Sequence, residues 1–257
     1  MSLVRDFYVP GHSWLHQLDP RVKLWGVTVG VLAAFALPGW GPQVALLLGM
    51  HLLLRSAGIS WGVLRAIWRQ MALLVIIILL LQPFFSPDGA AIVAWGPLQW
   101  TWGGIHAAAV LALRALAIAF ISGGLLLTTS PPALVRALVR LGLPYHWGFT
   151  ISLTLRFLPT IHALFLAVRD AQAARGWVTE GHLWRRLRGY LPVLVAVVVN
   201  TLRMSDQLTL ALAARGLGAD SRRTTWRDLR MRRLDWGVLA LLTLASGVIV
   251  VGWWGRL

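Results

Sequence analysis

Long apolar runs constrain this sequence more than any other feature, because they suit a lipid bilayer better than water. The hydrocarbon core of a membrane is about 30 Å thick and takes roughly 20 apolar residues in a helix. The runs occupy residues 24–37, 43–54, 68–86, 105–127 and 236–254. Only 13% of the residues are charged, against about a quarter in soluble domains. The sequence therefore predicts an all-α integral membrane protein with about five transmembrane helices.

The first two runs are short, and with their flanking residues they nearly reach across a bilayer. They flank PGWGP at 38–42, a proline–glycine turn typical of the tip of a helical hairpin. Basic residues precede the first run and lie between the second and third, whereas 38–42 and 83–104 contain none. Since basic residues concentrate on the cytoplasmic side of a membrane, we expect a cytoplasmic N-terminus.

The segment 128–235 differs from the rest, because it carries 16 of the 24 basic residues and is also rich in Leu, Val and Ala. A basic yet apolar helical segment suits a surface that lies against the membrane or another protein. We interpret it as a cytoplasmic helical coupling region inserted before the last span. The expected domains are a four-span N-terminal region at 1–127, coupling helices at 128–235 and a last transmembrane helix at 236–257.

Prolines and glycines divide the coupling region into helices. The stretch TTSPPALVRALVRLGLP predicts a short helix with prolines in its first turn. A long helix is expected over 145–175, bent near Pro159, and another over 190–215 with Pro192 in its first turn. Apolar residues recur at helical spacing in this last helix, at Leu191, Val195, Val198, Val199 and Leu202.

Two helices of the coupling region are expected to end in the same four letters, Ala-Ala-Arg-Gly. These lie in AQAARGWVTE and ALAARGLGAD, so that Arg175 and Arg215 are forty positions apart. Gly176 and Gly216 suit the left-handed residue that follows a helix, and the helix dipole favours an arginine in the last turn. Either these are two ordinary helix ends, or they are slim tips whose guanidinium groups bind carboxylates in two sockets of a dimeric partner.

The two Ala-Arg-Gly triplets resemble the coupling motifs of the transmembrane T component of energy-coupling factor (ECF) transporters, the EcfT/CbiQ family. The stretches SWLHQLDPRVKL, TTSPPALVRAL and LTLRFLPTI resemble the same family, and together they extend over nearly the whole chain. The resemblance implies a multi-pass protein of the prokaryotic inner membrane. It also implies a non-catalytic subunit that joins two ATP-binding-cassette (ABC) ATPases, identical or different, to a substrate-binding S component for uptake of vitamins or transition-metal ions.

The resemblance also implies which residues dock into grooves of the ATPases. They are the two triplets Ala174, Arg175, Gly176 and Ala214, Arg215, Gly216. The DPRVKL segment at 19–24 matches a family signature whose chemical role the sequence leaves open. A polar stop held at the membrane interface before the first span is an equally good interpretation.

The sequence offers no chemistry of its own for catalysis. It has no cysteine and no GxxxxGK[ST] phosphate loop, so ATP hydrolysis is expected in partner subunits. His12 and His16 have an i, i+4 spacing without a convincing third ligand, and we predict neither a metal site nor a cofactor. A lipid-handling enzyme embedded in the membrane is the alternative function. The acidic residues of this chain are too dispersed, however, to form the cluster of ionisable residues that such an enzyme needs.

Arg114 is the one charge well inside an expected span. Burial in lipid is costly, so its side chain should face the helix bundle or a partner, bonded to backbone carbonyls or hydroxyls. A stand-alone carrier is a further alternative, but such a protein would show more polar residues along its spans.

Overall fold

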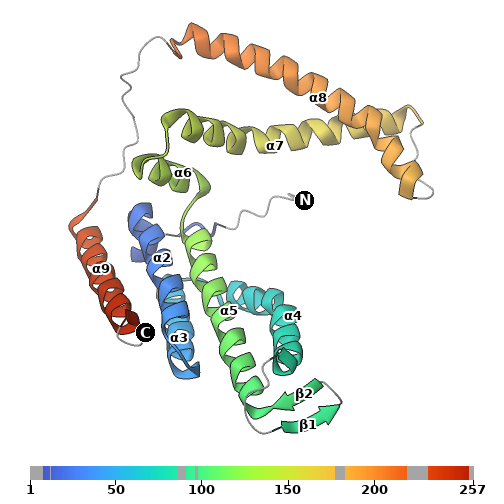
Figure 1. Cartoon of the computed structure of the whole chain (residues 1–257). Coiled ribbons are helices and arrows are strands. Elements are labelled where there is room, and N and C mark those ends of the chain that lie inside the picture. Colours follow the sequence, from blue (N-terminus) through green and yellow to red (C-terminus); the bar gives the residue numbers. More distant parts are fainter. Residues whose placement is uncertain are drawn as a thin grey trace. The chain divides into compact units, whose positions relative to one another are not determined.

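The protein is almost entirely helical in its computed structural model (Figure 1), which describes residues 8–11, 13–85, 91–95, 98–176, 183–218 and 231–254. The elements in chain order are α1 (Trp14–Gln17), α2 (Pro20–Ala36), α3 (Trp40–Ser56), α4 (Trp61–Phe85), β1 (Ala91–Trp95), β2 (Leu98–Thr101), α5 (Trp102–Thr128), α6 (Pro131–Arg140), α7 (Tyr145–Ala174), α8 (Leu183–Ala214) and α9 (Arg233–Trp254).

The chain forms two compact units. Among the described residues, those within 8–142 and 231–254 make up the first unit and those within 143–218 make up the second. We call them the main unit, which contains α1–α6 and α9, and the α7–α8 unit. The α7–α8 unit is shorter than the coupling region expected at 128–235, because α6 packs against α2 within the main unit.

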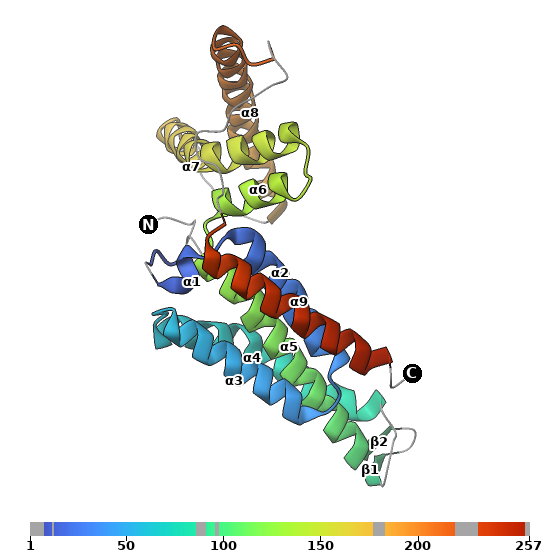
Figure 2. The ribbon, with the colours of Figure 1, turned by 90° about the vertical axis from the view of Figure 1, so that its left-hand side faces the viewer.

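Helix α5 is the centre of the main unit, where it packs against α2, α3 and α4. Helix α9 lies alongside α2 (Figure 2). Leu54, Leu64 and Phe120 are fully buried where α3, α4 and α5 meet. Small residues bring these helices close together, since a methyl group at Gly124 would collide with Met50. Close approach at glycine is the usual basis of helix packing in membranes.

The predicted hairpin of the first two apolar runs is confirmed by α2 and α3. The turn between them places Gly39 at φ 85°, a backbone angle that glycine adopts without steric cost. The buried amide of Gln43 donates to the carbonyl oxygens of Ala34 at 2.7 Å and Leu37 at 3.1 Å. These bonds satisfy carbonyls that the end of α2 would leave without partners.

Two boundaries in the main unit differ from the sequence prediction. Helix α4 begins at Trp61 rather than near residue 68, and its first turns therefore contain Arg65 and Arg69. Arginine is a good helix former, so the helix extends beyond its apolar part. The expected loop at 83–104 contains a small antiparallel sheet, in which β1 pairs with β2. Strands of four and five residues were too short for the apolar pattern to reveal.

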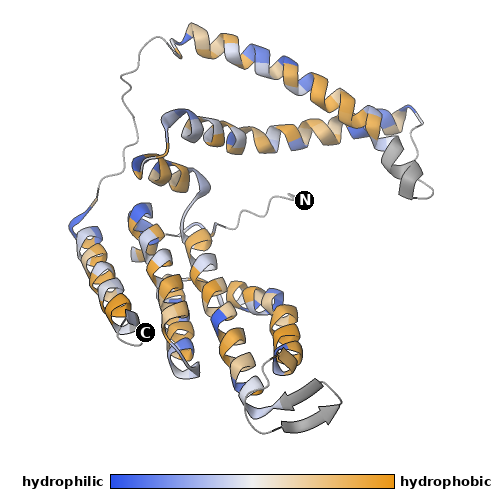
Figure 3. Cartoon of the chain, in the orientation of Figure 1, coloured by the Kyte–Doolittle hydropathy of each residue, from blue (hydrophilic) through white to orange (hydrophobic). Residues whose placement is uncertain are grey.

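Five helices in the described residues are long and apolar enough to cross a membrane, namely α4, α5, α7, α8 and α9. Their number agrees with the prediction, but the set differs. Helices α2 and α3 have only 17 residues each, whereas α7 and α8 are longer than a span requires. Helices α7 and α8 are less apolar than the other three. Figure 3 shows this difference as mixed colouring along α8.

The α7–α8 unit consists of these two long helices packed against each other. The predicted helix at 145–175 is confirmed by α7, which contains Pro159 in its interior. Helix α8 begins at Leu183, so the placement of Pro192 in a first turn was wrong. The upstream letters LWRRLRG are rich in helix-forming Leu and Arg, and they extend the helix before the proline.

Candidate coupling site at the ends of α7 and α8

The first Ala-Ala-Arg-Gly sequence forms the C-terminal end of α7. The helix ends at Ala174, and Arg175 is its C-cap with φ −87° and ψ 12°. The amide of Arg175 donates to the carbonyl of Gln172 at 3.1 Å, and that of Gly176 donates to Ala173 at 3.0 Å. Gly176 has φ 85°, so the chain turns away from the helix axis at the predicted glycine.

The second Ala-Ala-Arg-Gly sequence forms the C-terminal end of α8 in the same way. The amide of Arg215 donates to Leu212 at 3.1 Å and that of Gly216 to Ala213 at 2.9 Å, and Gly216 has φ 75°. The amide of Leu217 also returns to the carbonyl of Leu212 at 2.9 Å. This pair of bonds from Gly216 and Leu217 is a Schellman motif. The repeated letters therefore produce two helix ends with equivalent backbone geometry.

Both helix ends are exposed. Ala174, Arg175, Ala214 and Arg215 all lie at the surface of the chain. Neither guanidinium group has a hydrogen bond or an ion pair with any residue that the structure describes. The small alanines before each arginine leave the last turn slim, and each guanidinium group keeps its donors available for a carboxylate.

The two ends lie far apart, because α8 leads away from the C-terminus of α7. Figure 1 shows the C-termini of α7 and α8 at opposite ends of the helix pair. Helix α8 has 32 residues, and at 1.5 Å per residue its ends are separated by up to about 48 Å. Two tips at opposite ends of the helix pair suit two separate sockets rather than one shared pocket.

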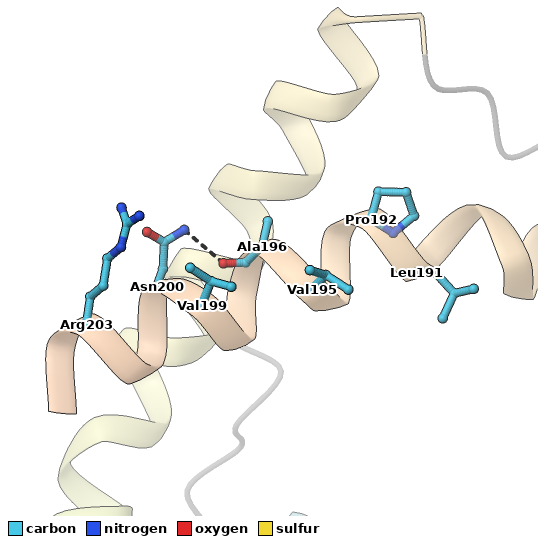
Figure 4. Close-up of a pocket in the computed structure, with 7 residues that line it drawn as sticks. All are labelled: Leu191, Pro192, Val195, Ala196, Val199, Asn200 and Arg203. Atoms are coloured by element: carbon cyan, nitrogen blue, oxygen red, sulfur yellow. Dashed lines mark hydrogen bonds between the residues drawn. The ribbon is translucent and has the colours of Figure 1, made fainter. Parts of the chain in front are cut away.

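An open groove runs along α8 between its two ends (Figure 4). Its lining residues are Leu191, Pro192, Val195, Ala196, Val199, Asn200 and Arg203. Leu191 is 54% and Val195 60% exposed, and both belong to the apolar series that the sequence indicated. Sequence reasoning missed the polar end of the groove, where the Asn200 amide donates to the Ala196 carbonyl at 2.9 Å.

Among the described residues, no group of three or more His, Asp or Glu side chains could hold a metal ion. Both ring nitrogens of His16 are occupied, since Nδ1 lies 2.6 Å from the Ser13 hydroxyl and Nε2 lies 3.0 Å from the Val9 carbonyl. The Val9 carbonyl can only accept a hydrogen bond, so Nε2 of His16 carries a proton and donates to it. In the neutral ring Nδ1 then accepts a hydrogen bond from the Ser13 hydroxyl. His12 lies outside the described residues.

Arg114 faces the bundle, but it makes none of the expected hydrogen bonds with the residues that the structure describes. Its guanidinium carbon lies 5.3 Å from the centre of the Phe35 ring, a cation–π contact. Its Nε is buried and has no hydrogen-bond partner within the described part of the chain. Phe35 belongs to the last turn of α2, where the negative end of the helix dipole also favours a cation.

These features define a multi-pass helical membrane protein with two exposed cationic helix ends of similar backbone geometry. Residues 11–226 match the CbiQ family, described as cobalt transport protein, and the chain therefore belongs to this family.

Curated relatives match this chain over nearly its full length. An energy-coupling factor transporter transmembrane protein EcfT from Listeria innocua is 30% identical over 96% of this chain and 97% of its own. One with the same description from Brevibacillus brevis is 32% identical over 96% of both chains. A Bifidobacterium longum protein described as an ABC transporter ATP-binding protein is 34% identical over 94% of this chain but only 31% of its own. The resemblance seen in the sequence is confirmed: the chain is the transmembrane component of an ECF transporter.

Proposed function

We propose that this subunit couples ATP hydrolysis by two partner ATPases to the movement of a substrate-binding S component. The arginine tips of α7 and α8 would each dock into one ATPase, where Arg175 and Arg215 bind carboxylates. The observation that carries this proposal is the pair of equivalent, exposed helix ends with unpaired guanidinium groups. Arginine is suited to this contact because its planar group binds a carboxylate through two parallel hydrogen bonds.

The Bifidobacterium relative supports an ATP-binding partner. That protein is about three times as long as the matching region, and its description names it as an ATP-binding protein. A chain that carries both an ATP-binding function and a region like this one suggests that the two act together. The subunit is then itself non-catalytic, and ATP is hydrolysed by its partners.

Helices α7 and α8 provide the mechanical link in this proposal. When ATP closes the two ATPases, their sockets approach each other and displace the two tips. Each tip displacement is then transmitted along its own helix. The exposed apolar face of α8, which includes Leu191, Val195 and Leu202, is the surface along which the S component moves. The S component then reorients and releases a vitamin or a transition-metal ion into the cytoplasm.

Charge reversal at both tips tests the proposal. Arg175→Glu combined with Arg215→Glu places a negative charge opposite each carboxylate, and we expect loss of co-purification with the ATPases and of ATP-driven uptake. Each single variant should be weaker, because the second socket still holds the complex. Insertion in the membrane should be normal in all three variants.

The matched control is Arg156→Glu combined with Arg169→Glu on α7, which changes the net charge equally but leaves both tips and the groove on α8 intact. This control should assemble with the ATPases like the parent protein. If the tip double variant assembles and transports as well as the control does, the proposed role of the two arginines is wrong.

A further inference from the structure

Five buried polar residues from three distant parts of the chain meet inside the main unit. We call them the polar junction, and they are Asp19, Lys23, Thr128, Thr129 and Asp235. Each is at most 8% exposed. Buried polar groups are costly unless they are paired, so this grouping requires an explanation beyond a polar stop before the first span.

Lys23 connects the first turn of α2 to the end of α5. Its ammonium group donates to the carbonyl of Thr128 at 2.9 Å and to the hydroxyl of Thr129 at 3.2 Å. The carbonyl of His16, at 3.4 Å, is a weaker third acceptor. The ammonium group of Lys23 thus donates hydrogen bonds to the link between α5 and α6. Thr128 in this link lies 105 positions after Lys23 in the sequence.

Asp235 connects the same turn of α2 to the start of α9. One carboxylate oxygen accepts the backbone amide of Asp19 at 2.9 Å, and the other accepts the amide of Arg232 at 2.6 Å. The side chain of Asp19 caps α2 through the amide of Arg21 at 2.9 Å. One aspartate therefore fixes the beginnings of two helices that are 216 positions apart.

The polar junction lies at both points where the chain connects the main unit to the α7–α8 unit. Residues 143–228 join the main unit through α6 on one side and through the residues before α9 on the other. Lys23 binds the link that leads into α6, and Asp235 binds the residue that precedes α9. Both covalent connections are therefore bonded to one turn of α2.

We propose that the polar junction is a clamp that holds these two connections together during the ATPase cycle, an inference that rests on the proposed coupling function. Movement of the α7–α8 unit then displaces α2, α5 and α9 as one body. Without the clamp, α6 and α9 would move independently and the displacement would be lost between them. Lys23 and Asp235 are positioning residues in this account.

Distance measurements between spin labels test the clamp directly, because the chain contains no cysteine and any introduced pair is unique. The first pair, Leu138→Cys with Leu241→Cys, joins exposed positions on α6 and α9. The second pair, Ala167→Cys with Gln207→Cys, joins exposed positions on α7 and α8. Both are measured in the purified complex with its ATPases, without nucleotide and with ATP bound.

We expect the α7–α8 pair to change its distance when ATP binds and the α6–α9 pair to keep one narrow distribution. In the Lys23→Met background the α6–α9 distribution should broaden or shift with ATP, while the α7–α8 change persists. The control Arg69→Met removes an exposed cation from α4 and should behave like the parent. A merely structural role of Lys23 would lower stability without creating an ATP-dependent change between α6 and α9.

The two proposals fail in different ways. An α7–α8 pair that ignores ATP would contradict the coupling function itself. The clamp alone is wrong if the α7–α8 pair responds but the α6–α9 pair moves equally in the parent protein. It is also wrong if Lys23→Met leaves the α6–α9 distribution unchanged, or if the variant loses both signals together.

Discussion

Replacement of Asp235 by alanine should destabilise the main unit strongly. The carboxylate accepts two backbone amides, those of Asp19 at 2.9 Å and Arg232 at 2.6 Å, and Asp235 is only 3% exposed. Hydrogen bonds to a charged group contribute about 1.5–3 kcal/mol each. The amide of Arg232 is only partly buried and can form a hydrogen bond with water once the carboxylate is removed. We therefore take the lower value for each of the two hydrogen bonds and expect the free energy of unfolding to fall by about 3 kcal/mol. In a soluble domain of this size that loss lowers the melting temperature by roughly 6–12 °C.

The assay is thermal unfolding in detergent. Unfolding is monitored by tryptophan fluorescence and by the fraction of the protein that remains monodisperse. Asp235→Asn keeps one acceptor oxygen and should lose about half as much stability as Asp235→Ala. The control Asp170→Ala removes an exposed carboxylate that pairs with its neighbour Arg169, and exposed pairs contribute little. If Asp235→Ala unfolds at the same temperature as Asp170→Ala, the buried bonds of Asp235 do not hold α2 and α9 together.

Two further substitutions test the packing of α5. Gly124→Val should destabilise the main unit, because the new side chain would displace the end of Met50 and press on Leu54; a Gly124→Val protein that unfolds at the parent's melting temperature would contradict the packing of α5 on α3. Arg114→Met should leave the melting temperature unchanged or raise it slightly, because it removes a buried Nε without a partner and loses only the contact with Phe35. A clear drop in the melting temperature of Arg114→Met would show that the arginine has a stabilising partner.

The repeated helix ends could be predicted from the sequence because they are local. A C-terminal glycine with positive φ needs only the residues of its own last turn, and Gly176 and Gly216 were placed correctly for that reason. The helices α2, α3, α5 and α9 followed from apolar runs and their flanking turns in the same way. Helix α8 extends further than predicted, since its arginine-rich start lacks the apolar pattern that marks a span.

The polar junction could not be predicted, because its partners are distant in sequence. The letters DPRVKL suggested only a polar stop before the first span. The partners of Asp19 and Lys23 lie 216 and 105 positions away, and nothing in the neighbourhood of Thr128 or Asp235 marks them as acceptors for that segment. Only the packing of α2 against α5 and α9 brings these groups together.

Protection of the two helix tips by the ATPases is the most direct measurement of the proposed function. Ala174→Cys and Ala214→Cys, made separately in this cysteine-free chain, place a reactive thiol in each exposed last turn. Ser205→Cys, exposed on α8 but away from the tip, is the control. We predict that bound ATPases slow maleimide labelling at least tenfold at both tip positions and leave the control unchanged. Labelling at either tip that is as fast in the complex as in the free subunit would contradict docking of the ATPases through these two helix ends.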